Sequence, residues 1–369
     1  MRHKLLLHLL LFLIPASLCG QEVEFEILKP YDRVYYNSNI PSVEVMAYAG
    51  RYFNSHGELE CIIKDGDKII YRFSQNFMAA MNDSAKLSFA FNLDPGFYKV
   101  ELRKEGKLIN ECVIGYEPEL IEKKGVVEEP GSGFENYWRG KIEELSTYPK
   151  LTEVYKVKEL SKGGKNIYRV SIHSFGGKTL EGYYAVPKQK GLYKAVVKAY
   201  ALSDTLDLED LERYAASDTL SDRICFTAQT EESVDIVRFV DFLQEEDAVS
   251  LSNIFVEGYG KAGAYALVAA AIDNRISAVA VYAPGCPDYT GADTPQYSNL
   301  WTAASKLKTP LLFGVDINGR VADPYTDFSV YNRVRCDKSY YIFLENGEPP
   351  MWERLKRNFF DKYTTHLLY

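Results

Sequence analysis

The first third of the chain carries short runs in which apolar and polar residues alternate. The clearest is the run from Tyr98 to Leu102, where every second residue is apolar after a turn at residues 94–96. Because successive side chains of a strand point to opposite faces, this run predicts a strand with one face on a core. Further strands are predicted at Val23–Leu28, Val43–Tyr48, Leu59–Ile63, Lys68–Phe73 and Leu87–Phe91. The pattern is typical of a small all-β immunoglobulin-like sandwich, which we assign to residues 21–118.

The pattern changes after this region. Residues 119–133 are rich in charge and end in Glu-Pro-Gly-Ser-Gly, which indicates a linker. From residue 134 to 369, short apolar runs alternate with amphipathic segments, the first of which is a helix with an apolar stripe from Phe134 to Leu145. Strands are predicted at Tyr168–His173, Leu180–Val186, Ala195–Tyr200, Ile224–Ala228, Ile254–Glu257, Ala278–Tyr282, Leu311–Val315 and Tyr340–Phe343. This alternation predicts an α/β domain whose mostly parallel sheet is covered by helices on both faces.

Residues 1–20 have the features of a secretory signal peptide. Arg2 and Lys4 give a positive start, and residues 5–14, interrupted only by His8, form an apolar run that is too short to span a bilayer. Cleavage before Gln21 predicts a secreted or periplasmic protein. Lipidation of Cys19 is an alternative, which the bulky residue before it disfavours. No other segment of the sequence is apolar enough to cross a membrane.

The composition is that of a soluble globular protein. Of 369 residues, 46% are hydrophobic and 25% are charged, and the length suffices for two domains. The formal net charge is −8 and no basic run is present, which argues against nucleic-acid binding because phosphates require clustered Lys and Arg. No Cys/His spacing predicts a metal site. Whether Cys61 and Cys112 form a disulfide stays open, as does the oligomeric state.

A glycine-rich segment over residues 256–264 joins a predicted strand to an alanine-rich helix. Gly258, Gly260 and Gly263 match G-x-G-x-x-G, a turn that binds the pyrophosphate of a dinucleotide at a helix N-terminus. That turn belongs to the first strand of its domain, whereas several predicted strands precede this one. The other interpretation is a nucleophile elbow, G-x-S-x-G, the sharp strand-to-helix turn that presents the serine of an α/β-hydrolase.

The sequence around this turn resembles that of the acetyl xylan esterase/cephalosporin C deacetylase family of carbohydrate esterases. The resemblance covers residues 134–360, and its main segments are Phe134–Trp138, Leu180–Pro187, Val234–Leu243 and Ala270–Ile276. It implies an α/β-hydrolase fold and, where the catalytic residues are present, the hydrolysis of acetyl esters.

The resemblance also assigns positions in the active site. The family's elbow reads like G-G-S-Q-G-G, which puts Gly260 at the serine position and Lys261 at the glutamine position. The family's oxyanion-hole strand reads like F-H-G-Y, whereas this chain has Ala-Tyr-Ala-Leu at residues 199–202. Tyr200 and Lys261 therefore mark the oxyanion-like positions.

The acid and the histidine of the triad have no counterpart at the matching positions. The acid follows the strand at residues 310–315, and alignment on the turn near Pro324 puts Gly319 at its position. The histidine belongs to a His-Glu-Gly-like turn, where this chain reads Glu-Asn-Gly-Glu with Gly347 at the histidine position. All three triad positions are thus glycine.

A second argument does not depend on the alignment. Beyond the leader the chain has three histidines, His56, His173 and His366, and none falls between the last predicted strand and the last predicted helix. No serine occurs from Glu257 to Ile276. Because a serine hydrolase needs a base in hydrogen-bond contact with its nucleophile, the sequence predicts a catalytically inactive protein.

The predicted function is therefore binding, either of a carbohydrate or of a protein. Through the resemblance alone, the carbohydrate would be a plant polysaccharide or oligosaccharide. One alternative is an active deacetylase that uses displaced residues such as Asp316 or Asp323. Another is nucleotide binding at the G-x-G-x-x-G turn. The main prediction involves no cofactor and no metal.

Overall fold

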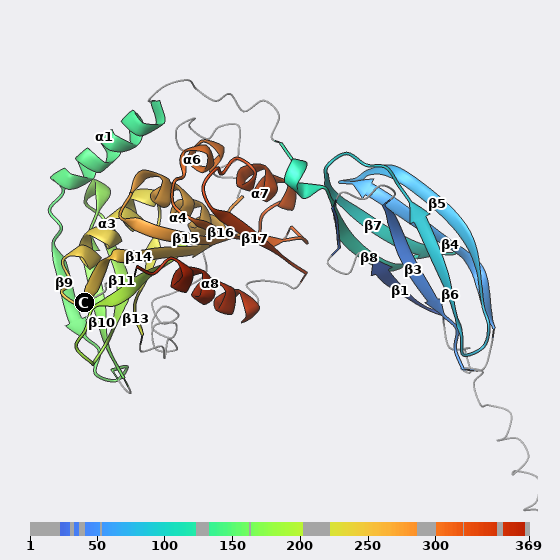
Figure 1. The fold of residues 1–369 in the computed structure, drawn as a ribbon, viewed down its shortest axis with the longest axis horizontal. Coiled ribbons are helices and arrows are strands. Elements are labelled where there is room, and N and C mark those ends of the chain that lie inside the picture. The colour runs from blue at the N-terminus through green and yellow to red at the C-terminus, as the bar shows by residue number, and fades with distance from the viewer. Residues whose placement is uncertain are drawn as a thin grey trace, which may run out of the picture. The chain divides into compact units, whose positions relative to one another are not determined.

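The computed structural model describes residues 23–29, 33–36, 41–51, 54–122, 133–161, 164–201, 222–285, 300–319, 321–344 and 350–365. The chain divides into two compact units, Met1–Pro118 and Glu119–Tyr369 (Figure 1). No helix within these described ranges is long and apolar enough to cross a membrane.

The first unit consists of two β-sheets whose apolar faces meet. Its strands are Glu24–Lys29 (β1), Val34–Tyr35 (β2), Ser42–Tyr48 (β3), Ser55–Asp65 (β4), Lys68–Ala79 (β5), Ser84–Ala90 (β6), Gly96–Lys104 (β7) and Lys107–Tyr116 (β8). One sheet has the order β1-β3-β6 and the other the order β2-β8-β7-β4-β5. A single hydrophobic core joins Val43 and Phe89 of the first sheet to Leu59 and Val100 of the second. The predicted β-sandwich is confirmed.

Cys61 and Cys112 lie in this core, and neither forms a disulfide. Cys61 is on β4 and Cys112 on β8, with β7 between these two strands. Two strand spacings separate the cysteines by ~10 Å, whereas a disulfide requires Cα atoms less than ~7 Å apart. Burial raises the pKa of Cys61 to about 12 and that of Cys112 to about 11. Both thiols are therefore protonated at neutral pH.

The second unit contains a sheet with nine described strands, in the order β17-β16-β15-β14-β12-β13-β11-β10-β9. Their bounds are Thr152–Lys156 (β9), Lys165–His173 (β10), Thr179–Pro187 (β11), Tyr193–Ala201 (β12), Arg223–Thr230 (β13), Val249–Tyr259 (β14), Ile276–Tyr282 (β15), Leu311–Asp316 (β16) and Lys338–Phe343 (β17). All pairs from β13 to β17 are parallel, whereas β11 pairs with both of its neighbours in the antiparallel sense.

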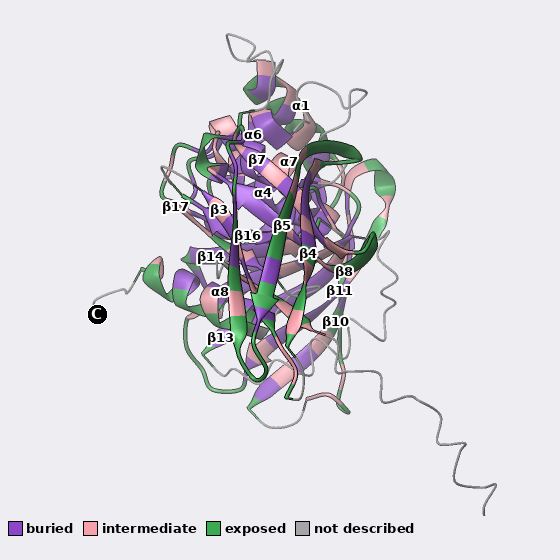
Figure 2. Cartoon of the chain, turned by 90° about the vertical axis from the view of Figure 1, so that its right-hand side faces the viewer, coloured by how far each residue is buried: buried purple, intermediate pink, exposed green. Residues whose placement is uncertain are grey.

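Helices cover both faces of this sheet (Figure 1). The described α-helices are Gly133–Thr147 (α1), Ser233–Gln244 (α3), Gly260–Ile272 (α4), Leu300–Lys306 (α6), Pro324–Tyr331 (α7) and Pro350–Lys362 (α8), with short 3-10 turns at Pro118–Leu120 and Phe175–Gly177. Helix α8 packs Trp352, Phe359 and Phe360 against strand residues that include Phe255. On the other face, α4 is buried along most of its length (Figure 2). The predicted α/β architecture, with a mostly parallel and doubly covered sheet, is confirmed.

The predicted strands of this unit all occur, and most extend beyond their predicted bounds. The structure also contains β9 over Thr152–Lys156, where the sequence pattern predicts no strand. Its last four residues are all exposed, so its sequence lacks the alternation that a half-buried strand imposes.

Candidate functional site

The strand-to-helix turn at the predicted elbow has the geometry that a nucleophile elbow requires. β14 ends at Tyr259, and α4 begins at Gly260 with no residue between them. Gly260 has a φ of +53°, in the left-handed region that residues with a Cβ rarely adopt. Nucleophile elbows hold their serine on such a strained turn. The backbone at residue 260 therefore fits an elbow, but the side chain is absent.

Gly258 and Gly263 allow the helix to pack closely against the strand. A Cβ at Gly258 would lie 2.4 Å from the carbonyl oxygen of Ala262, and a Cβ at Gly263 would lie 3.0 Å from the carbonyl oxygen of Gly258. Neither position can accept a side chain without moving the backbone. Packing of α4 on β14 thus explains the G-x-G-x-x-G spacing, and no phosphate ligand is needed to account for it.

An apolar loop faces Gly260. A Cβ added there would lie 3.1 Å from Cγ1 of Val321, which is closer than ordinary van der Waals contact. Val321 and Ala322 pack into a hydrophobic cluster with Tyr259 and Tyr282, whose rings stack at 5.3 Å. A serine hydroxyl at residue 260 would therefore emerge next to a valine methyl group.

The two oxyanion-like positions lie at the same edge of the sheet as Gly260. Ala199 of β12 pairs with Gly258 of β14, so Tyr200 is one residue beyond this pair, near the start of α4. The Tyr200 side chain packs against a small apolar cluster of β10, β11 and β13 residues. Lys261 is half-buried in the first turn of α4. The residues that follow β12, from 202 to 221, lie outside the described part of the chain.

Residues near the position that the resemblance assigns to the acid form hydrogen bonds with the local backbone. Gly319 has a φ of +65°, and a Cβ there would lie 3.1 Å from Cδ of Pro324. Asp316 is fully buried at the end of β16, where its Oδ1 accepts a hydrogen bond from the backbone N–H of Asn318 at 3.0 Å. Asp323 caps the N-terminus of α7, and its carboxylate accepts from two backbone N–H groups of the first turn. These contacts hold the turn after β16 and the start of α7, which is a structural use of both carboxylates.

Asp327 is a buried acid that the sequence analysis did not identify. Its side chain is fully buried in α7, and its Oδ1 accepts a hydrogen bond from the backbone N–H of Gly285 at 2.8 Å. Its Oδ2 has no hydrogen-bond partner within the described residues. Burial raises the pKa of Asp327 well above the ordinary value; the N–H of Gly285 acts against this shift, and the nearby carboxylates of Asp323 and Asp316 add to it. The only signal in the sequence is an acid among the apolar residues of a short helix.

No histidine that the structure describes in the second unit can act as a base at residue 260. The described ranges contain His56, which is in the β-sandwich, and His173, at the end of β10. Three strands separate β10 from β14, so four strand spacings place these strands ~19 Å apart. Gly347 and His366 lie outside the described residues. Within the ranges described, no group of three or more His, Cys, Asp or Glu side chains could hold a metal ion.

A buried ionic network lies just before the elbow. Oε1 of Glu257 is 3.1 Å from Nζ of Lys356 on α8 and 3.8 Å from Nζ of Lys198 on β12. Burial alone would lower the pKa of Lys198, but acidic groups around it, Cys225 first and then Glu257, raise it instead. These contacts attach α8 to the centre of the sheet. An acid at the end of an apolar strand was the network's only sequence signal.

The fold can be compared with solved structures. An acetyl xylan esterase from Paenibacillus sp. R4 matches with a TM-score of 0.56 and 16% identity, over 67% of this chain and 99% of that one. Acetyl xylan esterase 1 from Thermoanaerobacterium sp. JW/SL YS485 matches with a TM-score of 0.54 and 15% identity, over 67% of this chain and 98% of that one. With the strand order and the elbow, these likenesses define an α/β-hydrolase fold.

A comparison of sequences agrees with this comparison of structures. An acetyl esterase of Xylanibacter ruminicola, Axe7A, is 21% identical over 345 residues, which cover 77% of this chain and 78% of that protein. No family model matches the chain. The chain is similar in sequence to an acetyl esterase and in fold to acetyl xylan esterases, and the resemblance drawn from its motifs is confirmed.

Proposed function

We propose that this protein is an exported, catalytically inactive relative of the acetyl xylan esterases that binds a carbohydrate instead of hydrolysing it. The observation that carries the proposal is the elbow itself. Gly260 offers no nucleophile, and the space next to its Cα is taken by Val321. A hydrolase of this class needs a nucleophile, a base and room for the tetrahedral intermediate beside the oxyanion donors.

The displaced-residue alternative is weakened by the present use of its candidate acids. Asp323 caps a helix, and the Asp316 carboxylate is fully buried and bonded to the turn that follows it. An acid that orients a catalytic base must point at that base. His173, the histidine that the structure describes in this unit, lies on β10, six strand spacings or ~29 Å from β16, which carries Asp316. The proposal of a carbohydrate ligand is supported by the similar structures, two of which are named acetyl xylan esterases.

The test of inactivity is a hydrolysis assay on purified residues 21–369. The substrates are p-nitrophenyl acetate and an acetylated xylo-oligosaccharide, and an active acetyl xylan esterase serves as the positive control. We expect rates at the buffer background for this protein and for its Gly260→Ala variant. We also expect no gain in Gly260→Ser, because a hydroxyl without a base is a poor nucleophile. Turnover of the oligosaccharide that persists through further purification and in Gly260→Ala would disprove inactivity and point to other residues.

The test of binding is calorimetric titration with xylan-derived oligosaccharides, followed by a glycan array. Saturable binding of a xylo-oligosaccharide would support the carbohydrate role. Absence of binding to all xylan-derived ligands, together with background hydrolysis, would reject that role and favour a protein partner for the same scaffold.

A further inference from the structure

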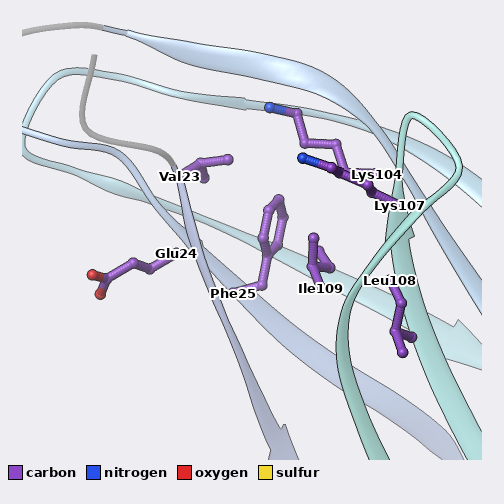
Figure 3. Close-up of a pocket in the computed structure, with 7 residues that line it drawn as sticks. All are labelled: Val23, Glu24, Phe25, Lys104, Lys107, Leu108 and Ile109. Carbon is purple, nitrogen blue, oxygen red and sulfur yellow. The ribbon is translucent and has the colours of Figure 1, made fainter. Parts of the chain in front are cut away.

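A groove opens at one end of the β-sandwich, where the edge strand β1 meets the hairpin formed by β7 and β8 (Figure 3). Its volume is about 760 Å³, and its lining includes Val23, Phe25, Lys104, Lys107 and Ile109. Small-molecule sites are typically clefts of roughly 300–1,000 Å³ with apolar walls and a few polar groups. The volume of the groove lies within this range, and its lining combines apolar and charged side chains.

The apolar floor of the groove is held in place by the two sheets. The Phe25 ring packs edge-to-face on Phe77, with ring centroids 5.3 Å apart. The side-chain amide of Asn110 donates a hydrogen bond to the carbonyl oxygen of Phe25 at 3.3 Å, which joins β1 to β8. Ile109 is 40% exposed beside this ring, and Figure 3 shows both side chains directed into the same space.

Two lysines on the rim form an arrangement that is unfavourable by itself. Lys104 and Lys107 are directly opposite each other in the β7–β8 register, next to the two-residue turn. Like charges at directly opposite positions of an antiparallel pair destabilise it. Neither ammonium group has a hydrogen-bond or ion-pair partner among the residues that the structure describes, whereas the neighbouring Arg103 pairs with Glu101. The carboxylate of Glu24, at the groove's edge, points away from both lysines (Figure 3).

We propose that the groove binds an organic carboxylate with an apolar body. The carboxylate would lie between the two ammonium groups, where charge-assisted hydrogen bonds form and the repulsion between the lysines is relieved. The apolar body would lie on Phe25 and Ile109. A neutral saccharide fits less well, because the floor offers few groups to bond its hydroxyls and unpaired hydroxyls lose affinity. This site lies on the β-sandwich and is independent of the function proposed for the esterase-like unit.

The test uses residues 21–369 and 3-phenylpropanoate as the probe, with binding measured by calorimetry and by ligand-observed NMR. We expect saturable binding at up to about 10 mM probe, and affinity at least about tenfold lower in Lys104→Gln/Lys107→Gln. The matched control is Lys68→Gln, because Lys68 closes the neighbouring β4–β5 hairpin but has Asp65 opposite it. This variant should bind the probe like the parent protein.

Two further ligands separate the contributions of charge and apolar surface. The neutral 3-phenylpropanamide should bind at least about tenfold more weakly than the carboxylate. Glucuronate, an anion with a polar body, should also bind more weakly. The proposal is overturned by a lack of binding of 3-phenylpropanoate, by equal binding of the amide, or by unchanged affinity in the double lysine variant. Tighter binding of glucuronate than of 3-phenylpropanoate would overturn the proposal that the ligand has an apolar body, and it would identify a site for acidic sugars.

Discussion

Replacement of Gly260 by alanine is expected to destabilise the α/β unit, although it adds only one methyl group. The φ of +53° costs a residue with a Cβ roughly 1–2 kcal/mol. The new Cβ would also lie 3.1 Å from Cγ1 of Val321, and relief of such overpacking costs about 1 kcal/mol or more. Alanine offsets about 0.5 kcal/mol of this loss of stability, because it restricts the conformations of the unfolded chain. The expected net loss is about 2 kcal/mol, or a drop in Tm of about 4–8 °C for a unit of this size.

The assay is urea and thermal unfolding of the full chain, followed by circular dichroism, with Gly140→Ala as the control. Gly140 lies inside α1 with no atom within 4 Å of the added Cβ. Alanine should therefore stabilise that helix by about 0.5–1 kcal/mol. The same substitution at two glycines is thus predicted to act with opposite signs.

A double-mutant cycle with Val321→Ala isolates the contact between the two residues. In the Val321→Ala background, the cost of Gly260→Ala should fall by about 1 kcal/mol, because the close contact is gone and the backbone cost stays. Two results would refute the reasoning. One is a Gly260→Ala variant as stable as the parent, and the other is a cost that does not depend on residue 321.

Three other predictions, two on variants and one on the cysteines, test other parts of the structure. Glu257→Gln should lower the free energy of urea-induced unfolding by about 1–3 kcal/mol, because it removes one of the two carboxylates, Glu257 and Glu353, that contact buried Lys356; a loss below about 0.5 kcal/mol would contradict a stabilising role of this ion pair. Because burial raises the folded pKa of Asp327 above 3.8, the unfolded state ionises first as pH rises, so the native state loses stability above about pH 4. Asp327→Asn should therefore gain stability relative to the parent from about pH 4 to pH 7, as measured by urea unfolding across that range, and a constant difference would contradict the shift. Cys61 and Cys112 should both react with a thiol reagent after unfolding without reductant, and reductant should not change the Tm; a missing pair of thiols would reveal a disulfide.

The parts of the fold that sequence could predict are those governed by local patterns. Residues Ala278–Tyr282 form a continuous apolar run, and they lie buried inside the sheet. The glycines at 258 and 263 predicted a tight strand-to-helix turn, because both lie within the same six residues of the chain. By contrast, β9 was missed because it is held by pairing with β10 and has no buried face of its own.

The candidate site depends on contacts between distant segments, which no local pattern encodes. Val321 reaches Gly260 across about sixty residues of sequence, and both lie at the carboxyl edge of the parallel strands, where α/β sheets place their sites. Asp327 reaches Gly285 across 42 residues. The resemblance predicts that glycine stands at the catalytic positions. It could not indicate that a valine faces one of them.

The two described glycines that the resemblance assigns to triad positions share a physical feature. Gly260 and Gly319 both have positive φ, and an added Cβ at either would meet a neighbour at 3.1 Å. Side chains at such positions cost stability and are retained when function requires them. In a protein that does not use the triad, as we propose for this one, glycine is the more stable choice at both. A serine introduced at residue 260 would therefore add strain without supplying a base, and activity would also require the loop that carries Val321 to move away.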